Sequence, residues 1–189
     1  MVRLFVGLAL PLSVREQLHT LTLMAGIPGV RWIAPQSYHI TLCFIGSVGE
    51  NIAEDIHMAL STIQAAPFTV EIIGTGAFSQ RRCVHSLWAG IKYTPLLFSL
   101  QDKVEQAVTR ICSNKKTTTR RYAPHITLAR LNSVPTIKVQ QFLTTSHLFR
   151  VQSFQVDRFI LFVSHFSSDG AFYERVSDYS LEKVVTINI

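Results

Sequence analysis

The tetrapeptide His-Ile-Thr-Leu occurs twice in this chain, at residues 39–42 and at residues 125–128. The chain has seven histidines. At ordinary residue frequencies such a repeat arises by chance in roughly one sequence in a hundred or fewer. The flanking residues of the two copies differ, so a recent long duplication does not explain the match. The repeat indicates that the same side chains are needed at two places.

Both copies lie in stretches rich in β-branched residues, which predicts that each is part of a strand. Successive side chains of a strand face opposite sides. His39 and Thr41 therefore share one face of the first strand, and His125 and Thr127 share one face of the second. In each copy an imidazole and a hydroxyl form a polar face, and the isoleucine and leucine form an apolar face.

Two such polar faces brought together would suit phosphate chemistry. Histidine titrates near neutral pH, so one imidazole can accept a proton while the other donates one. Threonine hydroxyls can donate hydrogen bonds to the nonbridging oxygens of a phosphate. The sequence has no His-Glu-x-x-His motif, and we expect no metal or other cofactor. We expect five histidines to be structural or solvent-exposed: His19, His57, His85, His147 and His165.

The composition is that of a folded, basic chain. Of its 189 residues 48% are hydrophobic and 16% charged, which excludes a disordered chain and favours a well-buried core. The formal net charge of +6 favours polyanionic partners, and a generally basic surface explains it equally well. Three widely spaced cysteines suit a reducing compartment. With no apolar run of membrane-spanning length and no cleavage site after the N-terminal apolar run, we expect a cytoplasmic chain.

The elements that must position the two motifs are short. Apolar residues at helical spacing predict helices over 12–25, 50–65, 95–112 and 134–145. Strands are predicted over 3–10, 30–33, 38–46, 68–78, 83–91, 125–131, 154–166 and 171–181. This order, with frequent hairpins, favours an α+β fold with antiparallel sheets. The two halves echo each other without a low-complexity linker, so we expect two lobes of one domain, 1–189.

Basic residues gather around the second motif and either contact the phosphate backbone of a nucleic acid or form a solvated loop. They are Lys115, Lys116, Arg120, Arg121 and Arg130. Arg130 has the strongest local case, because the tract RRYAPHITLAR, to which it belongs, resembles a block of a known protein family. Strict alternation points its side chain away from His125, so a bulge or a strand end is needed to bring it to the polar face.

Aromatic residues near the motifs are candidates for stacking on a base. They are Phe44, Phe78, Trp88 and Tyr122. Most aromatic side chains belong to the core and alternation puts Phe44 on the buried face, so we retain Tyr122 alone. Cys43 falls on the nominal face of His39. It is either a thiol at the site or a small buried filler, and we favour the filler.

These motifs resemble the two H-x-T-x signatures of the 2H phosphoesterase superfamily. Within it, the chain is similar to the bacterial and archaeal RNA 2′,3′-cyclic phosphodiesterases, also called 2′-5′ RNA ligases. The resemblance extends over nearly the whole chain. It rests on RLFVGLALP, VRWIAPQSYHITLCFIG and RRYAPHITLAR in this order, and on the 86 residues that separate the two motif histidines.

The resemblance implies a bilobal α+β fold with pseudo-twofold symmetry, in which two antiparallel sheets face a central cleft and the helices lie outside. It implies that His39 is the proton donor and His125 the acceptor in the metal-independent opening of an RNA 2′,3′-cyclic phosphate to a 2′-phosphate. Thr41 and Thr127 would hold the phosphate oxygens. Arg121, Tyr122 and Arg130 are further candidates for substrate binding.

The partner that the resemblance implies is RNA with a 2′,3′-cyclic phosphate end, such as a tRNA fragment, or a nucleotide. No membrane partner is expected, and the protein is expected to be a monomer. The site could also join RNA through a 2′-5′ linkage. A third hypothesis is an RNA- or nucleotide-binding module with incidental turnover. The two intact His–Thr pairs argue against it, because binding alone needs no paired proton-transfer groups.

Overall fold

The computed structural model describes residues 1–80, 83–112, 121–132, 134–167 and 170–182. Its helices are α1 (Leu12–Met24), α2 (Glu50–Ser61), α3 (Pro95–Ile111), α4 (Thr136–Ser146) and the short 3₁₀ helix η1 (Pro35–Ser37). Its strands are β1 (Val2–Ala9), β2 (Arg31–Trp32), β3 (His39–Val48), β4 (Phe68–Gln80), β5 (Cys83–Ile91), β6 (His125–Arg130), β7 (Arg150–Val156), β8 (Arg158–Ser167) and β9 (Gly170–Ser180). The four predicted helices are confirmed, with ends that differ by a few residues.

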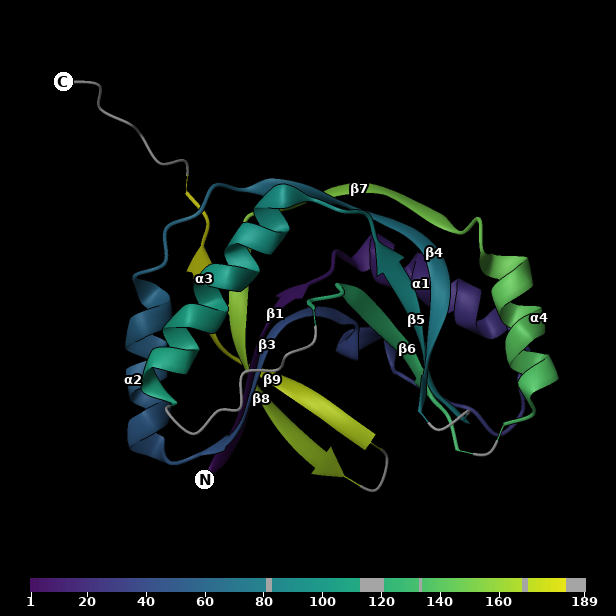
Figure 1. Cartoon of the computed structure of the whole chain (residues 1–189), viewed down its shortest axis with the longest axis horizontal. Coiled ribbons are helices and arrows are strands. Elements are labelled where there is room, and N and C mark those ends of the chain that lie inside the picture. Colours follow the sequence, from purple (N-terminus) through teal and green to yellow (C-terminus); the bar gives the residue numbers. More distant parts are fainter. Residues whose placement is uncertain (81–82, 113–120, 133, 168–169, 183–189) are drawn as a thin grey trace.

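The strands form two antiparallel sheets, which confirms the predicted α+β class. The first sheet has the order β3-β1-β8-β9 and the second the order β2-β6-β5-β4-β7. Helices α2 and α3 pack against the first sheet, and α4 packs against β4 of the second. Figure 1 shows α2 and α3 on one side of the molecule and α1 and α4 on the other, with the strands of both sheets between them.

The two sheets repeat one arrangement, which is the predicted pseudo-twofold relation. The order β3-β1-β8-β9 corresponds to β6-β5-β4-β7, and β2 is an additional edge strand. In each sheet the His-Ile-Thr-Leu strand pairs with a strand that leads directly into a helix, β1 into α1 and β5 into α3. The two motifs therefore occupy equivalent positions in the two sheets.

The apolar residues of both motifs anchor their strands in the core. Ile40 and Leu42 are buried, as are Ile126 and Leu128, and all four belong to one cluster with side chains from both sheets. Burial of each such side chain stabilises the fold by about 1.5–3 kcal/mol. The predicted apolar face of each motif is thus confirmed. None of the described helices is long and apolar enough to cross a membrane.

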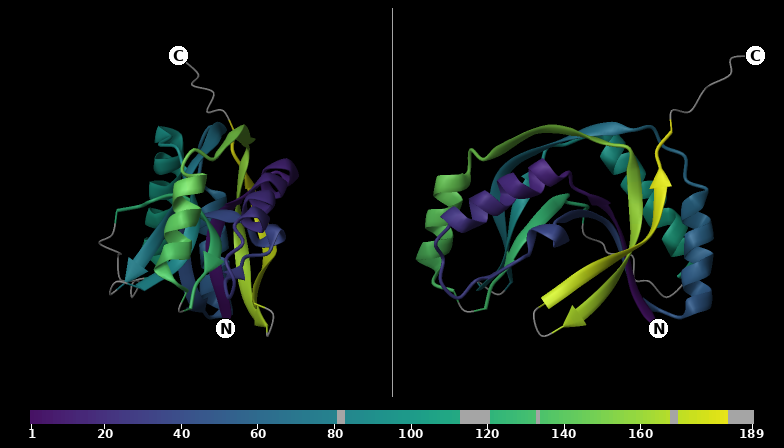
Figure 2. Two further views of the ribbon diagram at one scale, coloured as in Figure 1. Left: turned by 90° about the vertical axis from the view of Figure 1, so that its right-hand side faces the viewer. Right: turned by 180° about the vertical axis from the view of Figure 1, so that it is seen from behind.

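The single strand predicted over 154–166 is wrong, because two strands occupy this region. β7 pairs with β4 in the second sheet, and β8 pairs with β1 in the first. The chain passes from one sheet to the other at Asp157. In Figure 2 (right) the ribbon of β7 runs over the top of the molecule from α4 and then turns down into β8. Strand propensity is high on both sides of Asp157, so the sequence pattern does not reveal the change of sheet.

Candidate active site

A β-bulge in β3 changes which side chains share the face of His39. The register of β3 against β1 skips one residue between Thr41 and Cys43, which leaves Leu42 as the extra residue. Cys43 is therefore 5% exposed and in the core, whereas Phe44 is 65% exposed. The prediction that Cys43 is a buried filler is confirmed. The prediction that Phe44 is buried is wrong, because alternation does not continue through a bulge.

An equivalent bulge lies in β6. The register of β6 against β5 skips one residue between Thr127 and Ala129, so Leu128 is the extra residue. Ala129 is buried and Arg130 is exposed. The positive charge of Arg130 acts on both predicted catalytic histidines, His39 and His125. The bulge that Arg130 requires is therefore present.

Each motif imidazole is fixed by the backbone carbonyl two residues before it. The Nδ1 atom of His39 lies 2.8 Å from the carbonyl oxygen of Ser37, and that of His125 lies 2.7 Å from the carbonyl oxygen of Ala123. A carbonyl oxygen only accepts hydrogen bonds, so Nδ1 carries the proton in both rings. The opposite nitrogen, Nε2, then holds the lone pair of each neutral ring and can take up or release a proton.

An aromatic ring lies edge-on to each imidazole. Tyr173 of β9 contacts His39 with 4.9 Å between ring centroids and an interplanar angle of 79°. Phe78 of β4 contacts His125 at 4.9 Å and 83°. Phe5 of β1 adds a second ring 4.8 Å from His39. These rings exclude water from the imidazoles and fix their orientation.

The surroundings favour the neutral form of both imidazoles. Burial lowers the pKa of His39 to about 4, a hydrogen bond to the Ser37 carbonyl opposes this shift, and the charges of His125 and Arg130 add to it. Burial also lowers the pKa of His125, again with a contribution from Arg130. The effect of His125 on His39 requires the two rings to be near each other, since charge interactions fall with distance. Without a bound anion, both rings are neutral at pH 7.

A glycine makes room beside His39. Gly7 in β1 pairs with Thr41. A Cβ atom on Gly7 would lie 2.8 Å from the carbonyl oxygen of Ile40 and 3.6 Å from Cδ2 of His39. The absence of a side chain lets β3 approach β1 closely and lets the imidazole lie over the neighbouring strand.

Tyr122 ties the two motif strands together. Its hydroxyl donates a hydrogen bond of 2.9 Å to the carbonyl oxygen of Thr41, and its ring meets Phe98 edge-on at 5.4 Å. Burial raises the pKa of Tyr122, so the hydroxyl stays protonated and remains a donor. These contacts hold the chain just before β6 against β3. The stacking of a base on Tyr122 stays a prediction.

Thr41 and Thr127 are half-buried beside their histidines, and Arg121 is exposed at the start of the segment that leads into β6. Three of the predicted RNA-contact candidates lie outside the described residues: Lys115, Lys116 and Arg120.

Of the other histidines, His85 stacks on Phe78 with 6.3 Å between ring centroids, and two more have side-chain partners of their own. Nδ1 of His57, for example, lies 2.8 Å from the hydroxyl of Tyr179. His165 forms an ion pair with Glu174 when it is protonated, with 2.8 Å between Nε2 and Oε2. Over the part of the chain that the structure describes, no three His, Cys, Asp or Glu side chains form a group that could hold a metal ion.

Sequence reasoning missed an aromatic cluster on the polar face of the first sheet. Phe5 and Phe162 stack at 4.9 Å, and Tyr173 meets Phe5 edge-on at the same separation. These residues, with Ile160, form a cluster separate from the main core. The alternation of each strand hinted at two faces. It did not show which face of the β8–β9 hairpin lies beside His39.

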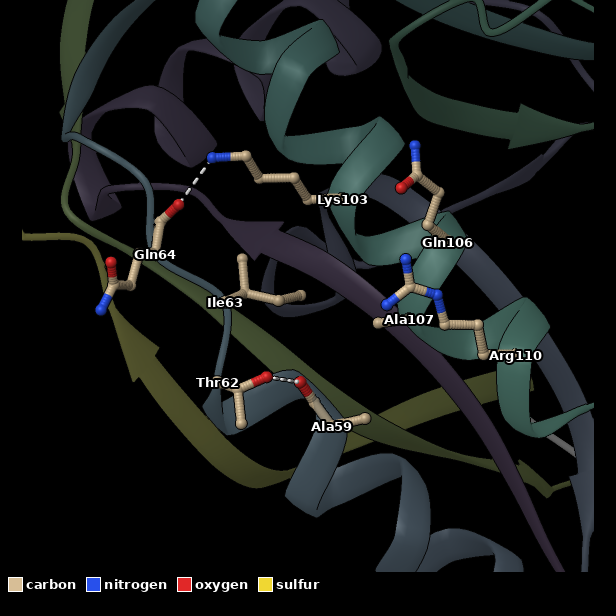
Figure 3. Close-up of a pocket in the computed structure, with 8 residues that line it drawn as sticks. All are labelled: Ala59, Thr62, Ile63, Gln64, Lys103, Gln106, Ala107 and Arg110. Carbon is tan, nitrogen blue, oxygen red and sulfur yellow. Dashed lines mark hydrogen bonds between the residues drawn. The ribbon is translucent and has the colours of Figure 1, made fainter.

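A hollow of about 290 Å³ lies apart from this site, between the end of α2 and α3 (Figure 3). Its lining residues are Ala59, Thr62, Ile63, Gln64, Lys103, Gln106, Ala107 and Arg110. The Lys103 ammonium group donates a 2.7 Å hydrogen bond to the Gln64 carbonyl oxygen. None of the predicted site residues lines this hollow.

Comparisons with known proteins agree with the resemblance. The RNA 2′,3′-cyclic phosphodiesterase of Archaeoglobus fulgidus is 30% identical over 131 residues, which cover 69% of this chain and 73% of that protein. The protein of the same name from Aquifex aeolicus is 24% identical over 186 residues, or 95% of this chain and 97% of the relative. The crystal structure of E. coli LigT with 3′-AMP matches with a TM-score of 0.78 at 23% identity and covers 95% of this chain and 98% of LigT.

The family model described as LigT like phosphoesterase matches residues 9–88 and 94–173. These two segments make up most of the chain, and each contains one His-Ile-Thr-Leu motif. The predicted enzyme of the phosphoesterase type is confirmed, and the chain belongs to the LigT-like phosphoesterase family.

Proposed function

We propose that the protein hydrolyses the 2′,3′-cyclic phosphate end of RNA to a 2′-phosphate. The observation that carries the proposal is the paired arrangement of His39 and His125. Both rings are anchored through Nδ1 and keep Nε2 available, and they lie on strands that Tyr122 holds together. The name shared by the relatives from Archaeoglobus and Aquifex supports the same substrate class.

The reaction assigns a different task to each ring. Nε2 of His125 accepts a proton from a water molecule as the water oxygen attacks phosphorus. The bond from phosphorus to the 3′ oxygen breaks, and His39 in its protonated form gives its Nε2 proton to that oxygen. The product is a 2′-phosphomonoester with a free 3′-hydroxyl. His39 ends neutral and His125 protonated, so proton exchange with solvent restores the starting pair.

The charge that develops on the phosphate needs stabilisation. Thr41 and Thr127 donate hydrogen bonds to its nonbridging oxygens, and the guanidinium group of Arg130 supplies a positive charge beside them. The acceptor His125 has the required neutral form in the free protein. The donor His39 must gain a proton, and the negative charge of the bound phosphate favours that gain.

Ligation would use the same groups. If a 5′-hydroxyl of RNA takes the place of water, His125 accepts its proton and the product contains a 2′-5′ linkage. The balance between the two reactions depends on whether water or RNA occupies the attacking position.

The test is incubation of the protein with a short RNA that ends in a 2′,3′-cyclic phosphate, in excess chelator. We expect a 2′-phosphate end, identified by phosphorus NMR, and no dependence on added metal. RNA affinity is measured in parallel for His39→Ala and His125→Ala. We expect these variants to bind RNA nearly as well as the wild type and to lose turnover. A 3′-phosphate product would show that the 2′ oxygen, not the 3′ oxygen, is the leaving group. If the wild-type protein binds the RNA but shows no turnover, the protein is a binding module and the proposal fails.

A further inference from the structure

Each motif histidine has an aromatic neighbour in the same edge-on position. The two neighbours differ by one hydroxyl group. Tyr173 meets His39 at 4.9 Å and 79°, and Phe78 meets His125 at 4.9 Å and 83°. The positions of the rings are thus nearly the same in the two halves. The hydroxyl of Tyr173 has no counterpart on Phe78, so it is a difference between the halves at the site itself.

The hydroxyl of Tyr173 lies in a positive environment. The charges of Arg130 from β6 and Arg3 from β1 both act on it. Burial raises the pKa of Tyr173 and outweighs these charges, so the phenol is neutral at pH 7 and can donate a hydrogen bond. Two cationic groups from two sheets near one donor form a combination that attracts an anionic oxygen.

The hydroxyl is also available. Two other tyrosine hydroxyls are used within the protein, that of Tyr122 on the Thr41 carbonyl and that of Tyr179 on His57. Within the described ranges the Tyr173 hydroxyl has no hydrogen-bond partner, and the side chain is half-buried rather than enclosed. A donor that faces solvent beside a histidine can bind a ligand without breaking an existing contact.

We propose that Tyr173 is a further substrate-binding residue, whose hydroxyl donates a hydrogen bond to a phosphate oxygen and whose ring positions His39. The inference rests on the proposed function, since it concerns the same phosphate. It gives the phosphate a second polar contact from the His39 half, besides that of Thr41. It also makes the two halves unequal in their grip on the phosphate, although their motifs are identical.

The ring has a separate task. It covers His39 together with Phe5, and both contacts keep water from the imidazole. The charged and titratable groups that act on His39 are His125 and Arg130 of β6. Removal of the ring would admit water while leaving those charges in place. The pKa of His39 would then rise, because water stabilises the protonated imidazole.

The experiment compares Tyr173→Phe, which keeps the ring, with Tyr173→Leu, which removes it. Tyr179→Phe is the matched control, because it deletes a hydroxyl from the opposite face of the same strand. The affinity for inorganic phosphate and the titration of His39 are followed by NMR of the imidazole protons. The kcat/KM for cyclic phosphate hydrolysis is measured beside them.

We expect Tyr173→Phe to bind phosphate roughly tenfold more weakly, because it loses a hydrogen bond to a charged group. The pH midpoint of the His39 titration should stay the same in this variant. Tyr173→Leu should weaken phosphate binding similarly and raise the His39 midpoint. Tyr179→Phe should change neither.

Equal phosphate affinity in wild type and Tyr173→Phe, or no phosphate binding by either, overturns the role of the hydroxyl. An unchanged His39 midpoint in Tyr173→Leu overturns the role of the ring. If Tyr173→Leu fails to fold, Tyr173→Phe still decides the hydroxyl. If the wild type binds phosphate through Tyr173 but does not open a cyclic phosphate, the proposed function fails and this inference stands.

Discussion

The His39 half and the His125 half of the site share their parts and differ in their surroundings. Each has the same tetrapeptide, a bulge at the same leucine, an Nδ1 anchor to a carbonyl two residues back and an aromatic ring edge-on to the imidazole. Beyond the bulge, the first strand continues with Phe44 and the second with Arg130. The first half places more aromatic rings around its imidazole, whereas the second carries the charge of Arg130 on the motif strand itself.

This difference is how a symmetric arrangement would support the asymmetric reaction that we propose. Two identical side chains can share one proton, but which of them is the acid is fixed only when their environments differ. Burial lowers the pKa of His39 to about 4, so this ring is a strong acid once it carries a proton. In the reaction that we propose, the more weakly enclosed His125 is the acceptor. In this proposal the fold repeats the two imidazoles, and their neighbours assign the roles of acid and base.

The equivalent positions Arg130 and Phe44 offer the largest contrast. We expect Arg130→Gln to lower kcat/KM for cyclic phosphate hydrolysis by about 100-fold, because it removes a charge that stabilises the transition state. Phe44→Leu, the matched change in the other half, should alter the rate by less than about threefold, because it removes no charge. Steady-state kinetics at one pH measure both. Similar losses in the two variants would remove the functional distinction between the halves.

Acid should destabilise the protein through His39. Its pKa is about 4 in the folded state against about 6.5 when unfolded, so its contribution is complete above pH 6.5 and is lost as pH falls toward 4. The expected loss between pH 7 and pH 4 is about 3 kcal/mol. Urea unfolding at both pH values measures it. His39→Gln should reduce the loss by about this amount; an equal loss in wild type and variant would show that His39 is not held neutral.

The pH dependence of hydrolysis should differ between free and bound enzyme. The pKa values of both histidines are lowered in the free protein, so the bell-shaped profile of kcat/KM should have its maximum below pH 6.5. The bound phosphate anion favours protonated imidazoles, so the profile of kcat should lie about one unit higher. Rates between pH 4 and pH 9 at low and saturating substrate test this. If the pH profiles of kcat and kcat/KM coincide, the charge of the bound phosphate does not raise the pKa values of the histidines.

Loss of the Tyr122 hydrogen bond, which joins the two motif strands, should have a smaller effect on stability and turnover. Tyr122→Phe removes the hydrogen bond to the Thr41 carbonyl and keeps the ring against Phe98. We expect a loss of about 1 kcal/mol in the free energy of unfolding, measured by urea denaturation. The same variant should weaken turnover a few-fold, because the motif strands are less firmly held. A variant as stable and active as the wild type would show that this bond does not position the strands.

The sequence predicted the two motifs, their faces and the α+β class, because period-two patterning and β-branched composition are local signals. It failed where a local pattern is interrupted. The bulge at Leu42 moved Phe44 out of the core, and the change of sheet at Asp157 divided one predicted strand into two. Tyr173 was missed for a different reason. Its contact with His39 depends on the packing of β9 beside β8 and β1, which no local pattern specifies.

The central claim is that His39 and His125 act as one acid–base pair. Single-turnover rates for cyclic phosphate opening by His39→Ala, His125→Ala and the double variant test it most directly. Because a proton-transfer pair fails when either member is absent, each single variant should be about 10²–10⁴-fold slower, and the double variant no slower than the slower single variant. Losses that multiply in the double variant, or a single variant that keeps the wild-type rate, would contradict the account.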